Sequence, residues 1–230
     1  MANVNVKEQN VETINKGEEF LLKNKKTIMY AVIALVVIIA GIILYNNFVK
    51  APREAEASTE LAKGQDLFNN QQFDKALNGD GATYAGFAKI ASDYSSTAAG
   101  NLANLYAGLC YANLGKWQEA VNFLDKYSPA DDEMVGPAAV AALGNAYAHV
   151  KEIDKAVANL KKAAKMADSQ ALENTNNSLA PTFLLQAATL LESQKNKAEA
   201  LKIYQDIKKK YVNSPISQEI DKYIERASAQ

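Results

Sequence analysis

The chain has 230 residues, of which 48% are hydrophobic and 22% charged, with 25 Lys and Arg against 26 Asp and Glu. This composition excludes intrinsic disorder over most of the chain, because it supplies enough apolar surface to bury a core. The balanced charge leaves no basic excess for a phosphate backbone, so a nucleic-acid partner is not expected. One Cys and one His exclude a disulfide framework and a typical zinc site, and we expect neither metal nor cofactor.

Residues 1–26 form a short, largely polar segment ahead of a long apolar run. The segment is too small to bury a core of its own. Its spaced apolar residues predict a short surface helix; they are Val11, Ile14, Phe20, Leu21 and Leu22.

Residues 27–49 contain no Asp, Glu, Lys or Arg, and the stretch from Ile28 to Tyr45 is almost purely aliphatic. A hydrocarbon layer about 30 Å thick needs roughly 20 helical residues to cross it. The run therefore predicts one transmembrane helix over residues 27–49. Tyr30 and Tyr45 lie near its two ends, where aromatic rings favour the membrane interfaces.

A cleaved signal peptide and a buried helix of a soluble protein are the alternatives for this run. The apolar part of a signal peptide usually spans about 7–15 residues and is followed at once by a cleavage site of small residues. Here the run is longer, and the A-x-A match at residues 55–57 lies well beyond it among charges. The pattern therefore favours an uncleaved anchor.

The charges that flank the apolar run predict its orientation. Three lysines precede it, whereas two cations follow it and are diluted by two glutamates; these residues are Lys23, Lys25 and Lys26, then Lys50, Arg53, Glu54 and Glu56. Positive charge is retained on the cytoplasmic side. We expect a cytoplasmic N-terminal segment, with residues 50–230 on the far side of the membrane.

Two segments beyond the anchor repeat the same plan, one at residues 105–124 and the other at residues 141–163. The pattern in each predicts two amphipathic helices, and equivalent residues lie 36 residues apart. The equivalent pairs are Gly108 and Gly144, Tyr111 and Tyr147, Trp117 and Ile153, Ala120 and Ala156, and Leu124 and Leu160. The spacing indicates a stack of repeated helical hairpins.

This pattern resembles the tetratricopeptide repeat, a helix-turn-helix unit of about 34 residues with small and aromatic residues at set places. A small residue at the helix crossing lets two helices approach closely. Weaker copies flank the two clear ones, at Gly64, Phe73 and Ala76, and at Ala188, Leu191, Ala200 and Tyr204. We therefore expect an all-α, tetratricopeptide-like helical repeat solenoid over residues 50–230, with about four helix pairs and a capping helix.

The alanines Ala76, Ala120, Ala156 and Ala200 are spaced by 44, 36 and 44 residues, so the two longer intervals require insertions. One is predicted at the turn-forming residues 78–81, followed by a helix from about Ala82 to Tyr94. The other is the polar stretch at residues 173–178. Gly136-Pro137 and Ala180-Pro181 place proline at the first position of a helix.

The last helix is expected to begin after Ser214-Pro215 and to reach about Ala227. Ser214 is a good N-cap. One apolar face of this helix would seal the end of the stack, as solenoids require; its residues are Ile216, Ile220, Tyr223, Ile224 and Ala227.

No set of residues assembles an active site, so an enzyme is not expected. Cys110 lies among packing residues and reads as a small buried hydrophobe. His149 near a helix end reads as a capping or solvent-facing residue. The acidic residues 131–133 indicate a solvated helix start and lack the ligand spacing of a calcium loop. Lys208, Lys209 and Lys210 spread around a helix and indicate a solvated face.

The remaining functional surface is the concave side of the stack, which the first helix of each pair would line. An aliphatic floor with scattered amide and hydroxyl groups suits an extended or helical peptide. We expect no small-molecule substrate. A carboxylate-clamp function is not expected either, because leucine and alanine stand at the corresponding places. The predicted lining is Leu61, Gln65, Phe68, Leu102, Leu105, Leu109, Asn113, Ala141, Asn145, His149, Leu185, Thr189 and Glu192.

A short lysine-bearing segment, one anchor and a C-terminal repeat domain together resemble the bacterial ancillary SecYEG translocon subunit (YfgM-like) family, from Glu12 to Arg226. The resemblance rests on architecture and repeat register. It implies a single-pass inner-membrane protein with periplasmic repeats that links translocon subunits and unfolded secreted clients to periplasmic chaperones. The alternative among binding proteins is a tethered coordinator of cell-envelope or division machinery. An enzyme for peptide or polysaccharide turnover is the alternative from another class.

Overall fold

The computed structural model describes residues 20–229, and every regular element within them is helical. The all-α prediction is therefore confirmed. The chain divides into two units, one ending at Arg53 and the other beginning at Glu54, and each is described separately below. Val11 and Ile14 of the predicted surface helix lie outside the described residues.

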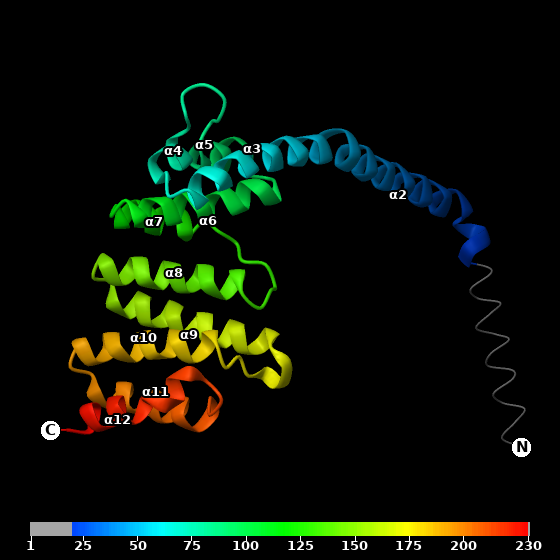
Figure 1. The fold of residues 1–230 in the computed structure, drawn as a ribbon. Helices are drawn as coiled ribbons and strands as arrows, with labels where there is room; N and C mark the ends of the chain where they lie inside the picture. Colours follow the sequence, from blue (N-terminus) through cyan, green and yellow to red (C-terminus); the bar gives the residue numbers. More distant parts are fainter. Residues whose placement is uncertain (1–19, 230) are drawn as a thin grey trace, which may run out of the picture. The chain divides into compact units, whose positions relative to one another are not determined.

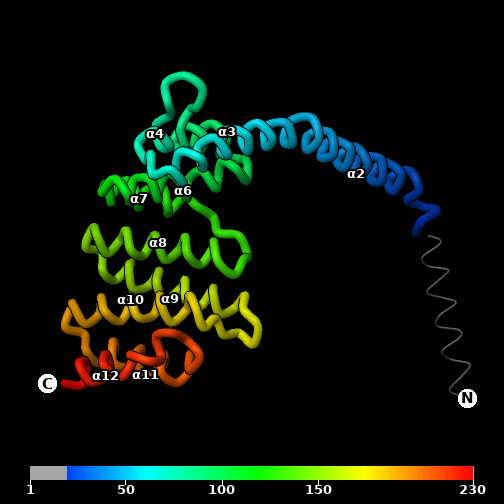
Figure 2. The backbone as a smooth tube through the Cα atoms, in the orientation of Figure 1, coloured from blue at the N-terminus to red at the C-terminus, as the bar shows by residue number. Residues whose placement is uncertain are grey.

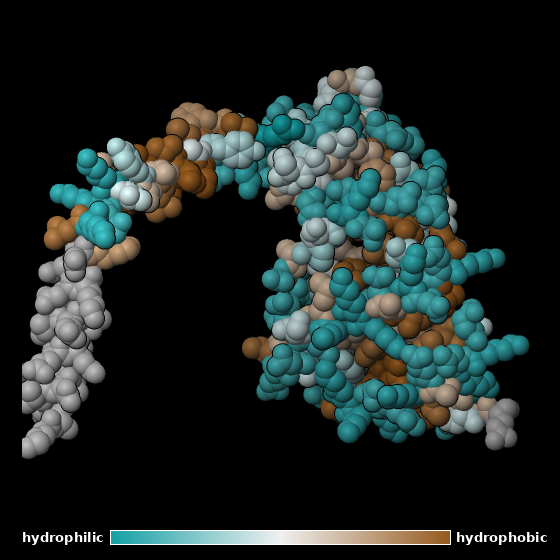
Figure 3. Space-filling view, turned by 180° about the vertical axis from the view of Figure 1, so that it is seen from behind, coloured by the Kyte–Doolittle hydropathy of each residue, from teal (hydrophilic) through white to brown (hydrophobic). Residues whose placement is uncertain are grey.

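The first unit is dominated by α2 (Lys25–Tyr45), which is followed by the π-helical turn η1 (Asn46–Lys50). None of the α2 side chains is buried. On the side seen in Figure 3, most of the surface of this helix is hydrophobic. By length and composition this helix is apolar enough to cross a membrane.

The second unit is a stack of helix pairs, which Figures 1 and 2 show in the same orientation. The pairs are α3 (Ala51–Asn69) with α4 (Phe73–Asn78), α6 (Ala98–Asn113) with α7 (Trp117–Leu124), α8 (Val135–His149) with α9 (Ile153–Gln170), and α10 (Leu179–Ser193) with α11 (Lys197–Lys210). Three short elements and one helix complete the unit: α5 (Phe87–Asp93), η2 (Leu172–Asn174), η3 (Pro215–Gln218) and the final α12 (Ile220–Ser228).

Each of the four pairs turns through the same backbone motif. One residue adopts a left-handed conformation, at Gln71, Gly115, Lys151 and Lys195. The N–H of the next residue then donates to the carbonyl five residues earlier, from Gln72 to Leu67, Lys116 to Tyr111, Glu152 to Tyr147, and Asn196 to Leu191. This is the Schellman arrangement that ends a helix. Its recurrence shows that the four pairs are copies of one structural unit.

Small residues let the two helices of a pair approach closely. A Cβ added at Gly108 would lie 2.5 Å from Cγ of Leu124, and one added at Gly144 would lie 3.0 Å from Cγ of Leu160. Gly64 differs, because a Cβ added there would meet the Tyr84 hydroxyl and the Phe87 ring, which lie outside the α3–α4 pair. The alanines at the equivalent place in the second helices are fully buried; they are Ala76, Ala120, Ala156 and Ala200.

The core is divided into three clusters along the stack. The first joins α3 to α6 around Phe87 and Cys110. The second joins α6, α7 and α8 around Leu124. The third joins α8 to α12 around Leu160 and Tyr204. Each cluster connects neighbouring helix pairs, which is the nearest-neighbour stabilisation typical of solenoids.

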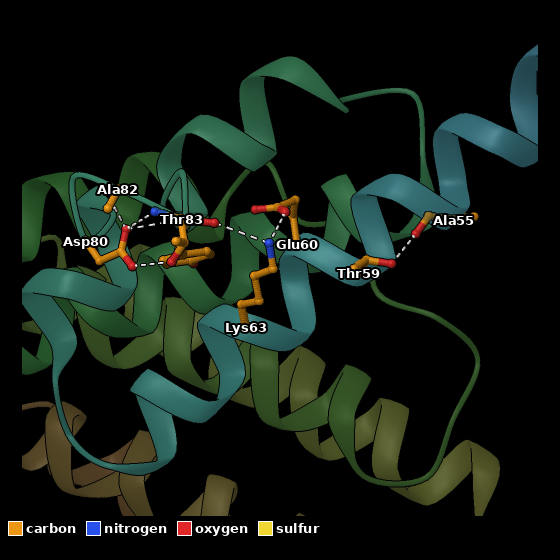
Figure 4. A network of polar contacts seen from close by, with 8 residues as sticks. Ala55, Thr59, Glu60, Lys63, Asp80, Ala82 and Thr83 are labelled. Atoms are coloured by element: carbon orange, nitrogen blue, oxygen red, sulfur yellow. Dashed lines mark hydrogen bonds and ion pairs between the residues drawn. The ribbon is translucent and has the colours of Figure 1, made fainter.

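The helix predicted from Ala82 begins instead at Phe87, because Asp80 holds the preceding residues in a loop. Its carboxylate accepts hydrogen bonds from the N–H groups of Ala82, Thr83 and Tyr84 at 2.8–2.9 Å and from the Thr83 hydroxyl at 2.6 Å (Figure 4). These bonds, with the Thr83 side chain first, lower the pKa of Asp80. Lys63 of α3 donates to the Thr83 carbonyl and also pairs with Glu60, so the loop is held against α3 (Figure 4).

The predicted last helix is also interrupted. Ser214 caps the short turn η3, accepting a hydrogen bond from Ser217 N–H at 3.3 Å, and α12 begins only at Ile220. The two prolines expected at first helical positions lie two residues further in: Pro137 and Pro181 are each the third residue of their helix. That place is tolerated because the first N–H groups of a helix have no intrahelical partner.

Candidate functional site

A cavity of about 420 Å³ opens between the first helices of successive pairs. We call it the apolar cavity. Its walls come from α3, α6, the start of α8 and the residue before α8, and they carry no charged side chain. The wall residues are Phe68, Leu102, Leu105, Tyr106, Leu109, Met134, Val135, Ala138, Ala139 and Ala142. Such a surface suits an apolar side chain from a partner.

The aromatic wall of the apolar cavity is held in place by neighbouring rings. Phe68 meets Tyr106 edge to face with centroids 5.2 Å apart, and Tyr106 stacks on Phe87 at 4.9 Å. Gln65 donates from Nε2 to the Tyr106 hydroxyl at 3.0 Å. Gln65, a predicted groove residue, therefore does not line the cavity itself but holds Tyr106 in the wall through this hydrogen bond.

Two of the predicted groove leucines are core residues. Leu61 is 6% exposed and packs with Ala57 and Phe87, away from the apolar cavity. Leu105 is also 6% exposed; it touches the cavity from the core cluster of α6, α7 and α8. Leu102 and Leu109 also line the cavity and are half-buried.

A second hollow of about 540 Å³ lies further along the stack and is more polar. We call it the polar hollow. Its lining comes from α8, α10 and α12: Asn145, Ala148, Leu185, Gln186, Thr189, Leu190, Tyr223 and Arg226. Three predicted groove residues, Asn145, Leu185 and Thr189, are brought together here. The contribution of α12 was missed, because the sequence indicated only a capping role for it.

Arg226 is fixed at the rim of the polar hollow by Glu192. Its guanidinium makes an ion pair with that carboxylate, and the Tyr204 hydroxyl donates to the same carboxylate at 2.7 Å. The Arg226 hydrogen bond is the main cause that lowers the pKa of Glu192. Gln186 Oε1 is buried and has no hydrogen-bond partner among residues 20–229.

The predicted lining residues Asn113 and His149 lie in neither hollow. The Asn113 side chain donates to the Leu109 carbonyl of its own helix at 2.8 Å. His149 is solvent-exposed, and its ring stacks on Trp117. The predicted Ala141 is buried in the core.

The candidates for chemistry are held in structural roles. Cys110 is fully buried, and burial raises the pKa of its thiol to about 12. Asp132 caps α8 by accepting from the N–H groups of Met134, Val135 and Gly136. Lys208 pairs with Asp221 at 2.6 Å. Over residues 20–229 no three His, Cys, Asp or Glu side chains converge as metal ligands would.

Comparison with known proteins agrees with the repeat architecture. The tetratricopeptide repeat family matches residues 102–128 and 182–214. Two solved structures of nearly identical TPR-like repeats of a kinesin light chain from Podosopora anserina, one of them a point variant, each superpose with a TM-score of 0.54 at 12% identity. They cover 76% of this chain and 86% and 85% of their own. No curated protein matches the sequence. The chain thus carries tetratricopeptide repeats in a tetratricopeptide-like solenoid.

Proposed function

We propose that this protein is a non-enzymatic, membrane-anchored scaffold that grips protein partners through the first helices of its repeats. The observation that carries the proposal is the apolar cavity, whose walls hold half-buried leucines and aromatic rings without any charged group. Anchoring apolar side chains in such a pocket supplies most of the affinity in protein recognition. The polar hollow adds amide, hydroxyl and guanidinium groups that can bond the partner's backbone.

Matched substitutions of two alanines test this binding site. Ala142 lines the apolar cavity, whereas Ala158 is exposed on α9 outside both hollows. Ala142→Gln places a polar side chain in the cavity and is expected to reduce partner recovery at least tenfold. Ala158→Gln should leave recovery unchanged. Equal recovery with the two variants contradicts the proposal.

The partner proposed first is the protein-secretion translocon, with unfolded secreted chains and periplasmic chaperones as further partners. The family resemblance in anchor and repeat layout supports this. Purification of the intact, detergent-solubilised protein should co-isolate translocon subunits. Co-isolation of cell-wall or division proteins in their place would favour the alternative, a tethered coordinator of the cell envelope.

The proposed topology places residues 1–26 in the cytoplasm and residues 50–230 in the periplasm of a bacterial inner membrane. The apolar α2 and the lysines before it support this orientation. External protease added to spheroplasts should digest the repeat unit. Survival of the C-terminal portion under those conditions would contradict the topology.

A further inference from the structure

We infer that one edge of the repeat unit rests on the lipid surface of the membrane. We define this loop edge by three segments: residues 125–134 between α7 and α8, residues 171–178 between α9 and α10, and residues 211–214 before η3. The inference rests on the proposed membrane anchoring of α2. It adds a second membrane contact, made by the repeats themselves.

The exposed large apolar side chains of the repeat unit gather at this edge. Among described residues from 54 onward they are Met134 at 68% exposure, Val135 at 50%, Leu172 at 90% and Val212 at 62%. Three of them belong to the loop edge, and Val135 begins α8 directly after it. The turns within the pairs, at the opposite edge in Figure 1, instead carry Gln71, Gly115, Lys151 and Lys195. One edge is therefore suited to an apolar phase and the other to water.

Hydrogen bonds connect the loop edge to the point where the chain enters the unit. Glu54, at the start of α3, accepts from the N–H groups of Ala98 and Ala99 at 2.7 and 2.9 Å. In the same first turn of α6, the Asn101 side chain exchanges two hydrogen bonds of 2.8 Å with the backbone of Ser128. The loop before Met134 is thus tied to the end of α6 that Glu54 caps.

The other two loops are joined by Asp168, near the end of α9. Its carboxylate accepts from Asn176 N–H at 2.9 Å and from the Tyr211 hydroxyl at 2.7 Å, and it pairs with Lys210. The loop that carries Leu172 is therefore fixed in place by the buried Asp168 side chain. The two residues that follow Leu172, Glu173 and Asn174, both adopt left-handed conformations with φ of 57° and 51°. Such conformations are costly for non-glycine residues and persist where the surroundings hold them.

We assign lipid as the partner of this edge because the connection between the repeat unit and the proposed anchor is short. Residues 46–53 separate Tyr45 from Glu54, and even a fully extended chain of that length reaches only about 30 Å. The entry point of the repeat unit is therefore confined near the membrane surface. Because tethering makes the contact intramolecular, a few weakly inserting side chains suffice. Asp131, Glu133 and Glu173 flank Met134 and Leu172, so the contact is assigned to zwitterionic lipid.

Lipid quenching of single fluorescent labels tests this inference on the full-length chain. Cysteines are introduced by Met134→Cys, Leu172→Cys and Val212→Cys at the loop edge, by Lys151→Cys and Lys195→Cys at the opposite edge, and by Val36→Cys within α2. Cys110 is buried, so the unsubstituted protein serves as the labelling blank. Each variant is labelled with an environment-sensitive dye and reconstituted into phosphatidylcholine vesicles containing nitroxide-bearing phosphatidylcholine.

We expect quenching at positions 134, 172 and 212 to be at least twice that at positions 151 and 195. Equal quenching at the two edges, with position 36 strongly quenched, would overturn the loop-edge contact and leave the anchor standing. An unquenched label at position 36 would overturn both the loop-edge contact and the proposed membrane anchoring of α2. Labels at positions 172 and 212, which lie outside the apolar cavity, would show a protein occupant if they were protected from aqueous iodide but not quenched by lipid, and that result would also overturn the inference.

A second variant checks that the apolar side chains carry the contact. Leu172 is almost fully exposed, so Leu172→Gln leaves the packing of the unit intact. Combined with Met134→Gln, it should reduce lipid quenching of a label at position 212 by at least half. Unchanged quenching in this double variant would contradict the contact.

Discussion

Trp117 and His149 stack face to face, with ring centroids 3.5 Å apart and planes inclined by 1°. Trp117 is the first residue of α7 and His149 the last of α8, so the stack joins the second and third helix pairs. Offset and edge-to-face aromatic pairs contribute roughly 0.5–1.5 kcal/mol beyond the area they bury, and a face-to-face stack is less favourable than either.

We expect His149→Ala to lower the free energy of unfolding by about 1 kcal/mol and to shift the emission of Trp117, the chain's single tryptophan. His149→Phe keeps a stacking ring and should retain most of that stability. Chemical denaturation followed by tryptophan fluorescence measures both effects. If the alanine and phenylalanine variants were equally stable, the stack would contribute nothing.

Substitution of the left-handed turn residues by glycine is expected to stabilise the protein, whereas His149→Ala is expected to destabilise it. Lys151 and Lys195 adopt φ of 66° and 63°, a conformation that glycine reaches without cost. We expect Lys151→Gly and Lys195→Gly each to raise the free energy of unfolding by roughly 0.5–1 kcal/mol.

The equivalent glycine supplies the matched control. Gly115 has φ of 73°, and a Cβ added there would meet no atom within 4 Å. Gly115→Ala should therefore destabilise by about 1 kcal/mol through backbone conformation alone. Thermal unfolding followed by circular dichroism would reveal the signs, and a destabilising Lys151→Gly would contradict this reading of the turn.

The stability lost on replacing a crossing glycine with alanine should depend on the free space beside that glycine. Gly108→Ala would bring Cβ within 2.5 Å of Leu124 Cγ, whereas Gly144→Ala would leave 3.0 Å to Leu160 Cγ. Overpacking of this kind costs about 1–3 kcal/mol, so Gly108→Ala should destabilise more than Gly144→Ala. Urea titration of the two variants gives the order of their stabilities. The reverse order would show that the residues around Gly144 move aside less readily than those around Gly108.

Glu192 links stability to pH. Its pKa in the folded protein is lowered by Arg226, so its contribution is present above the unfolded pKa and is lost as pH falls through the folded value. Glu192→Gln should lower the melting temperature at pH 7, by an amount corresponding to about 1 kcal/mol. The difference from the unsubstituted protein should shrink steadily below about pH 4.5. A difference independent of pH would exclude this linkage.

The repeat register was predictable because it depends on residue size at regular spacing. Gly108, Ala120 and Leu124 recur 36 residues later, and in both sets a Cβ added at the glycine would crowd Cγ of the leucine. Local side-chain bonds were harder to foresee. Asp80 can bond to a loop as readily as it can cap a helix, and the start at Phe87 depends on that choice.

The candidate site could be predicted only by position along each first helix. Register brought Phe68, Leu102 and Leu109 to one cavity, but it could not separate the buried Leu105 from its accessible neighbours. Met134 and Val135 were missed because they precede the repeating pattern. The Trp117–His149 stack joins different pairs, and no spacing within one repeat indicates it.

Photocrosslinking in intact membranes tests most directly whether partners are held by the first helices. A photoreactive residue is placed at Ala138 or Ala142 in the apolar cavity, and for comparison at Ala158 or Lys162, both exposed on α9. We predict partner adducts from positions 138 and 142 and none from positions 158 and 162. Adducts that form equally from both helices, or only from α9, would contradict the scaffold account.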